Sequence, residues 1–154
     1  MLTQEEKKIE EEALAFAREH KKEIARRLTD PNRFIPEDDP VSVFMAGSPG
    51  AGKTEASIEL LAAVEADGAE ILRIDPDDLR YEFPNYEGGN SWLFHKAVSV
   101  LVEKIHDMAL KQKQSFLLDG TLSNYEKAEQ NIARSLKKGR VVQIADRGRT
   151  GPTY

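Results

Sequence analysis

The chain has 154 residues, of which 40% are hydrophobic and 32% charged, and its formal net charge is −5 at pH 7. This length fits a single domain, residues 1–154, and the acidic balance argues against a nucleic-acid-binding protein. The absence of cysteine excludes disulfides and thiolate metal sites, while a polar N-terminus and the lack of an apolar run of about 20 residues predict a cytoplasmic protein without membrane contact.

Residues 1–30 are expected to form one long helix. Thr3-Gln4-Glu5-Glu6 has the form of a capping box, apolar residues then recur at helical spacing, and Asp30-Pro31 ends the pattern. The opposite face mixes Glu, Lys and Arg, which is more typical of a solvated helix surface than of a binding site. A partner protein could still use this face.

The most specific motif follows a predicted strand at 41–46. It has the form G-x-x-x-x-G-K-[ST] and precedes a helix-forming run at 55–66. In such a loop, inward-pointing backbone N–H groups and the helix N-terminus bind phosphate, the lysine reaches the β- and γ-phosphates, and the hydroxyl binds Mg²⁺. The chain is therefore predicted to bind a nucleoside triphosphate with Mg²⁺ through Gly47, Ser48, Pro49, Gly50, Ala51, Gly52, Lys53 and Thr54.

Short apolar strands and helices alternate along the rest of the chain. Strands are predicted at 70–75, 115–119 and 141–145, a long irregular loop at 76–90, and helices from Ser91 and after a second capping box at 123–126. The last helix places Tyr125, Ala128, Ile132 and Leu136 on one face. The pattern predicts an α/β fold of the P-loop kinase type: a core at 41–145 with a parallel sheet of about four strands, helices on both faces, and a tail at 146–154.

Carboxylates follow two of these strands, and the carboxyl ends of parallel strands share one ligand-binding crevice. Asp119 ends the third strand and suits a Walker-B role in holding Mg²⁺, although it could merely start the Asp-Gly turn that follows. Asp75, Asp77 and Asp78 follow the second strand, where one of them could accept a proton from an attacking hydroxyl. They could equally cap a short helix at 79–82, and spacing alone does not choose between them.

Together, the phosphate loop, the stretches 74–80 and 84–86, and Leu118-Asp119-Gly120-Thr121 resemble the zeta-toxin family of nucleotide-sugar kinases. The resemblance implies ATP-dependent phosphorylation of a sugar hydroxyl on UDP-N-acetylglucosamine by the toxin of a toxin-antitoxin pair, with an antitoxin protein as partner. It also implies that Lys53 and Thr54 serve ATP and Mg²⁺ and that Asp77 is the general base. Glu103 and Thr121 fall where the family contacts the nucleotide sugar, although Glu103 could be an ordinary solvated helix residue.

Members of this family usually continue beyond the fourth strand into a basic segment, and the setting of Arg147 and Arg149 does not resemble it. Arginines over the transferring phosphoryl group can contribute about 10³ to 10⁵ in rate. Two alternatives therefore stay open. The chain could be a truncated nucleotide-binding module with weak catalysis, or a P-loop kinase of another small hydroxyl-bearing substrate.

Overall fold

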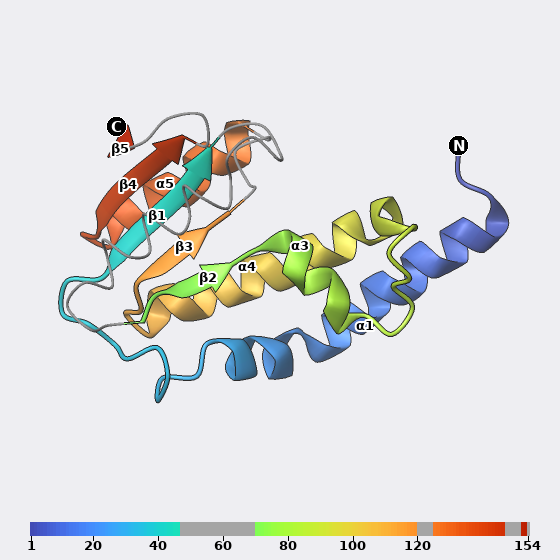
Figure 1. The fold of residues 1–154 in the computed structure, drawn as a ribbon, viewed down its shortest axis with the longest axis horizontal. Helices are drawn as coiled ribbons and strands as arrows, with labels where there is room; N and C mark the ends of the chain where they lie inside the picture. Colours follow the sequence, from blue (N-terminus) through green and yellow to red (C-terminus); the bar gives the residue numbers. More distant parts are fainter. Residues whose placement is uncertain (47–69, 120–124, 147–151, 154) are drawn as a thin grey trace. The chain divides into compact units, whose positions relative to one another are not determined.

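The structure is a computed structural model that describes residues 1–46, 70–119, 125–146 and 152–153 (Figure 1). The chain divides into two compact units, each described by itself below. The first joins Met1–Thr29 to Asp75–Met108, and the second joins Asp30–Ile74 to Ala109–Tyr154. The single-domain organisation predicted from the sequence stays a prediction. In the described ranges, no helix is both long and apolar enough to cross a bilayer.

The first unit begins with α1 (Gln4–Leu28), which starts and ends where the sequence predicts. The capping box is formed: Thr3 Oγ1 accepts a hydrogen bond from the Glu6 N–H at 3.1 Å, and Glu6 Oε1 accepts one from the Thr3 N–H at 2.9 Å. At the other end, the Thr29 N–H donates to the Ala25 carbonyl at 2.9 Å. The buried residues of α1 are Ala13, Ala17, Ile24 and Ala25.

The segment at 76–90 is more ordered than the predicted irregular loop. It contains α3 (Pro76–Leu79) and the 3-10 helix η2 (Arg80–Glu82), and η3 (Ser91–Phe94) and α4 (His95–Lys111) follow it. The short helix predicted at 79–82 begins earlier because Asp75 is its N-cap and Pro76 occupies its first turn.

Aromatic side chains attach this segment to α1. The Phe83 ring centroid lies 5.5 Å from that of Phe16 on α1 and 5.4 Å from that of Phe94 on η3. Tyr86 extends the series by packing edge-on against Phe94 at 5.5 Å. Since Phe83 and Phe94 are buried, these rings form a small apolar core that α1 shares with the segment that follows Asp75.

Polar contacts reinforce the same packing. The Asn85 amide donates to Glu12 of α1 at 3.0 Å, and Arg27 near the end of α1 forms an ion pair with Glu82 of η2. Lys96 at the start of α4 lies 3.7 Å from Glu10, and α1 and α4 lie side by side (Figure 1). The first unit thus holds the 76–90 segment against α1 at several points.

The second unit contains a sheet with strand order β2-β3-β1-β4-β5 (Figure 1). β1 (Val41–Ala46), β2 (Leu72–Ile74), β3 (Phe116–Leu118) and β4 (Val141–Asp146) are parallel, as predicted. The fifth strand, β5 (Pro152–Thr153), pairs antiparallel with β4, so the interpretation of 146–154 as a mere tail was wrong for these two residues. A strand of two residues is too short to show an alternation of apolar and polar side chains, so the sequence contains no sign of it.

α5 (Tyr125–Lys137) precedes β4 in the second unit, and Gly139 in a left-handed conformation (φ +74°) follows it. Its buried residues are Ala128, Asn131 and Ser135, whereas Leu136 is 59% exposed. The predicted position of Leu136 on the inner face was therefore wrong. Polar Ser135 occupies the inner face because its hydroxyl donates to Ser42 Oγ of β1 at 2.8 Å.

Arg140 is a buried arginine at the start of β4. Its guanidinium donates to the carbonyls of Gln114 and Ala109 at 2.7 and 3.0 Å and to Ser42 Oγ at 3.3 Å, and it lies 5.3 Å from the centre of the Phe116 ring. Burial lowers the pKa of this group from its ordinary value, and the charge of Glu37 opposes that shift. A buried cation with these donors joins α4, β1 and β3 at the amino ends of the two strands.

We expect Arg140→Met to lower the free energy of unfolding by roughly 2–4 kcal/mol, because buried acceptors that lose their donor cost about 1–3 kcal/mol each. Urea denaturation followed by circular dichroism measures the change. Lys138→Met, at an exposed position two residues earlier, is the control and should change stability by less than about 0.5 kcal/mol. Equal stabilities of the two variants would contradict the role given to Arg140.

Candidate functional site

The site begins where β1 ends. β1 is buried between β3 and β4, and its last residue, Ala46, directly precedes the predicted phosphate loop. Residues 47–54, with Lys53 and Thr54, lie outside the described residues, and so does Thr121. Their predicted contacts with ATP, Mg²⁺ and the nucleotide sugar stay predictions.

Asp119 lies directly after β3, the neighbour of β1. Its N–H donates to the Ile74 carbonyl at 2.9 Å, which continues the β2–β3 pairing by one residue, and its side chain is fully buried. Because Phe44 of β1 pairs with Leu118, Asp119 lies at the level where β1 approaches the phosphate loop. A carboxylate in this place has the chemistry that a magnesium ligand requires.

A cation already lies beside this carboxylate. Arg73 of β2 places a guanidinium nitrogen 3.6 Å from Asp119 Oδ2, and Arg73 pairs in the sheet with Leu117, two residues before Asp119. Within the described part of the chain, no three His, Asp or Glu side chains converge on a common point. Mg²⁺ at Asp119 would therefore share the carboxylate with Arg73 and take most of its other ligands from phosphates and water, as Mg²⁺ commonly does.

The three aspartates after β2 have different environments. Asp75 is buried, and its Oδ1 accepts a hydrogen bond from the Asp77 N–H at 2.9 Å as the N-cap of α3. Asp77 and Asp78 are exposed. Both readings of this cluster therefore have a place: Asp75 is the helix cap, and the exposed aspartates remain available for chemistry.

Asp77 is held at its backbone and at its carboxylate. The backbone N–H binds Asp75, and Oδ1 accepts a hydrogen bond from the Arg80 guanidinium at 2.7 Å. The Asp77 side chain is 58% exposed and that of Arg80 is 29% exposed. The result is a solvent-accessible carboxylate with a defined orientation. Whether it shares a crevice with Asp119, which belongs to the other unit, stays a prediction.

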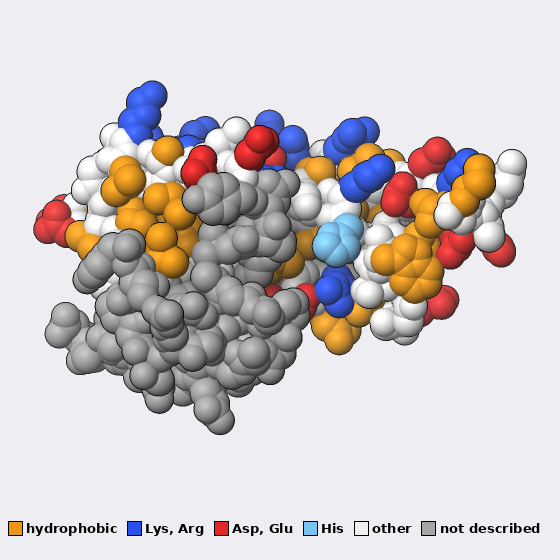
Figure 2. Space-filling model, turned by 90° about the horizontal axis from the view of Figure 1, so that it is seen from above, with side chains coloured by type: hydrophobic (Ala, Val, Ile, Leu, Met, Phe, Trp, Pro, Cys, Tyr) orange, Lys and Arg blue, Asp and Glu red, His pale blue; other side chains and the backbone are white. Residues whose placement is uncertain are grey.

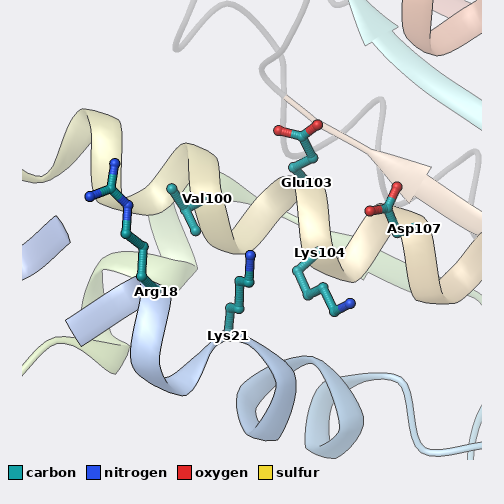
Figure 3. Close-up of a pocket in the computed structure, with 6 residues that line it drawn as sticks. All are labelled: Arg18, Lys21, Val100, Glu103, Lys104 and Asp107. Atoms are coloured by element: carbon teal, nitrogen blue, oxygen red, sulfur yellow. The ribbon is translucent and has the colours of Figure 1, made fainter. Parts of the chain in front are cut away.

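Glu103 lies on α4 at an exposed position in the first unit. It lines a cavity of about 330 Å³ between α1 and α4, together with Arg18, Lys21, Val100, Lys104 and Asp107 (Figure 3). Arg18 and Lys21 project from α1 toward α4 in this view, and both signs of charge are present among the lining residues. Figure 2 shows acidic and basic side chains interspersed on one face of the molecule. The role of Glu103 toward a nucleotide sugar stays a prediction.

Two arginines that contact candidate aspartates, one in each unit, did not emerge from the sequence. Arg80 follows Asp77 by three residues, which is the spacing of neighbours on a helix, so a local signal was present. Arg73 gave no such signal, because its proximity to Asp119 depends on the pairing of β2 with β3.

Comparisons with known proteins agree with this architecture. A chain from the PezAT chromosomal toxin-antitoxin system of Streptococcus pneumoniae matches with a TM-score of 0.69 and 22% identity, over 95% of this chain and 57% of that one. The crystal structure of AvrRxo1-ORF1:AvrRxo1-ORF2 with sulphate ions contains a chain that matches with a TM-score of 0.54 and 21% identity, over 90% of this chain and 45% of that one. No curated protein matches the chain.

These likenesses concern the fold, and they confirm the predicted α/β fold of the P-loop kinase type with a long N-terminal helix. The chain spans 57% of the length of the PezAT chain and 45% of the AvrRxo1 chain. The sequence profile of the zeta toxin family matches residues 9–146, which include the predicted phosphate loop, Asp77 and Asp119. The protein therefore belongs to the zeta toxin family.

Proposed function

We propose that the chain is an ATP-dependent kinase that phosphorylates a sugar hydroxyl of UDP-N-acetylglucosamine and acts as the toxin of a toxin-antitoxin pair. The observation that carries this proposal is the family match over residues 9–146. The described residues support it with an oriented, exposed carboxylate at Asp77 and a buried one at Asp119 beside the strand that enters the phosphate loop.

In the proposed reaction, the sugar hydroxyl oxygen attacks the γ-phosphorus of ATP. A new O–P bond forms, the bond from the γ-phosphorus to the β–γ bridging oxygen breaks, and ADP leaves with the bonding electrons. Asp77 orients the hydroxyl and takes its proton. The backbone N–H groups of residues 47–54, other than Pro49, and the Lys53 side chain hold the phosphates, and Glu103 and Thr121 hold the nucleotide sugar.

Thr54 and Asp119 would hold Mg²⁺, which when bound neutralises charge on the phosphate oxygens. The partner would be an antitoxin protein, a proposal supported by the family and by the PezAT toxin-antitoxin system to which one structural relative belongs.

The second candidate is a nucleotide-binding module with little turnover. Arg73 favours it, because a guanidinium 3.6 Å from Asp119 competes for the carboxylate that a catalytic Mg²⁺ would use. This candidate predicts ATP binding without product. A kinase of another small hydroxyl compound would instead form product only with a different acceptor.

The proposed activity is tested by incubating the purified chain with ATP, Mg²⁺ and UDP-N-acetylglucosamine and detecting a phosphorylated sugar nucleotide by mass spectrometry. Lys53→Ala should reduce product formation by about 10²-fold or more, because a cation on the transferring phosphate is lost. Asp77→Asn should reduce the rate by about 10²- to 10⁴-fold with nearly unchanged ATP affinity, since it removes only the proton acceptor. Equal amounts of product from wild type and Lys53→Ala would contradict the proposed kinase activity.

Arg73 and Asp119 make a separate prediction about Mg²⁺. Arg73→Gln removes the competing cation, so the Mg²⁺ concentration for half-maximal activity or nucleotide binding should fall by about tenfold, which corresponds to roughly 1.4 kcal/mol. Asp119→Asn should raise it. Arg33→Gln serves as the control, because Arg33 pairs with Glu70 at an exposed position of the same unit. A Mg²⁺ requirement that is the same in Arg73→Gln and Arg33→Gln would contradict competition by Arg73, and one that is unchanged in Asp119→Asn would exclude Asp119 as the metal carboxylate.

A further inference from the structure

The Asp77–Arg80 pair carries an inference that rests on the proposed function and goes beyond it. We propose that Arg80 is a positioning residue, which orients the Asp77 carboxylate toward the acceptor hydroxyl. The observation is the 2.7 Å hydrogen bond from Arg80 Nη2 to Asp77 Oδ1. A carboxylate has about four lone-pair positions on its two oxygens, so pairing at Oδ1 leaves capacity for a hydroxyl donor.

The Arg80 side chain is less exposed than that of the aspartate that it contacts. In the sequence, Arg80 follows Leu79 and precedes Phe83 by three residues, and the side chains of Leu79 and Phe83 are buried. The Phe83 N–H donates to the Arg80 carbonyl at 3.2 Å, and the Phe83 ring packs between Phe16 and Phe94. The guanidinium therefore projects from a backbone that the aromatic core of the first unit fixes, while the Asp77 side chain is mostly exposed.

Orientation matters more here than the bare presence of a carboxylate. In phosphoryl transfer the protein contributes chiefly positioning and electrostatic stabilisation, and the base acts largely by orienting the nucleophile. A displacement of about 1 Å in such a group can reduce the rate by about 10²-fold. An exposed carboxylate can adopt several rotamers, and the hydrogen bond from Arg80 favours the one in which Oδ1 faces the guanidinium.

A purely structural role for Arg80 is a weaker explanation of the pair. An exposed ion pair at i,i+3 contributes little to the free energy of unfolding, and Asp75 already caps α3. Removal of the Arg80 side chain should therefore leave the fold intact, and this makes an activity measurement interpretable.

The first experiment measures kcat and KM of Arg80→Ala and Arg80→Lys with ATP, Mg²⁺ and UDP-N-acetylglucosamine. Arg80→Ala should lower kcat by about 10- to 100-fold with a KM for ATP within about twofold of wild type. Arg80→Lys, which keeps the charge, should recover part of the loss. Arg27→Ala is the control, because it removes an arginine–carboxylate pair between α1 and the same segment without removing a contact of Asp77. An Arg80→Ala variant as active as Arg27→Ala would overturn the proposal.

A double-mutant cycle separates action through Asp77 from direct contact with the phosphoryl group. If Arg80 acts through Asp77, Arg80→Ala should cause no further loss of rate in an Asp77→Asn background. A full second loss in that background would place the effect of Arg80 elsewhere and would overturn the proposal. The kinase function is judged separately. If wild type forms product and Lys53→Ala does not, the kinase proposal holds whatever the Arg80 variants show.

The third measurement needs no activity. In protein labelled with ¹³C at the aspartate carboxyl carbons, the Asp77 signal is assigned as the one that disappears in Asp77→Asn. Arg80→Ala should shift or broaden this signal, whereas Arg27→Ala should leave it in place. An Asp77 signal that is the same in wild type and Arg80→Ala would show that the pair does not form in solution, whatever the enzyme assay gives.

Discussion

The pairing of β1 with β3 is the constraint on which the second unit depends. Val43 and Phe44 of β1 face Leu117 and Leu118 of β3 in register, and all four side chains are fully buried. Val43 and Phe44 are consecutive and point to opposite faces of the sheet, so apolar side chains pack on both faces at this level. The same register sets Asp119 beside the end of the strand that leads to the phosphate loop. The place of a chemical group thus follows from apolar packing several residues away.

Arginines serve opposite ends of this sheet in different ways. Arg140 contacts Ser42 and Gln114 near the amino ends of β1 and β3, where its donors satisfy buried acceptors. Arg73 lies beside Asp119 at the carboxyl end, where parallel sheets bind ligands. The cation at the amino end satisfies buried protein acceptors, whereas any ligand bound by Asp119 would also meet the cation at the carboxyl end. This separation explains why one arginine is buried among carbonyls and the other is paired with a carboxylate.

Local patterns predicted those parts of the fold that local energetics determine. The capping box of α1, β1 at 41–46 and the end of α5 near Gly139 each depend on residues within a few positions of one another. Features that depend on distant partners were missed. Leu136 is exposed because the Ser135 hydroxyl binds Ser42 from another element, and β5 exists because β4 offers a free edge. The proximity of Arg73 to Asp119 is of the same kind, since it requires two strands to pair first.

The aspartate cluster combines a helix cap and an exposed carboxylate within one short sequence. Asp75 and Pro76 start α3, and the cap binds the backbone N–H of Asp77 itself. Burial of the Asp75 carboxylate as a cap removes it from contact with a large substrate, while the turn that it starts presents Asp77 to solvent. The alternative between helix cap and proton acceptor is therefore not exclusive. The cap gives the neighbouring Asp77 carboxylate a defined place. Residues outside this cluster must select the substrate that would receive a phosphoryl group.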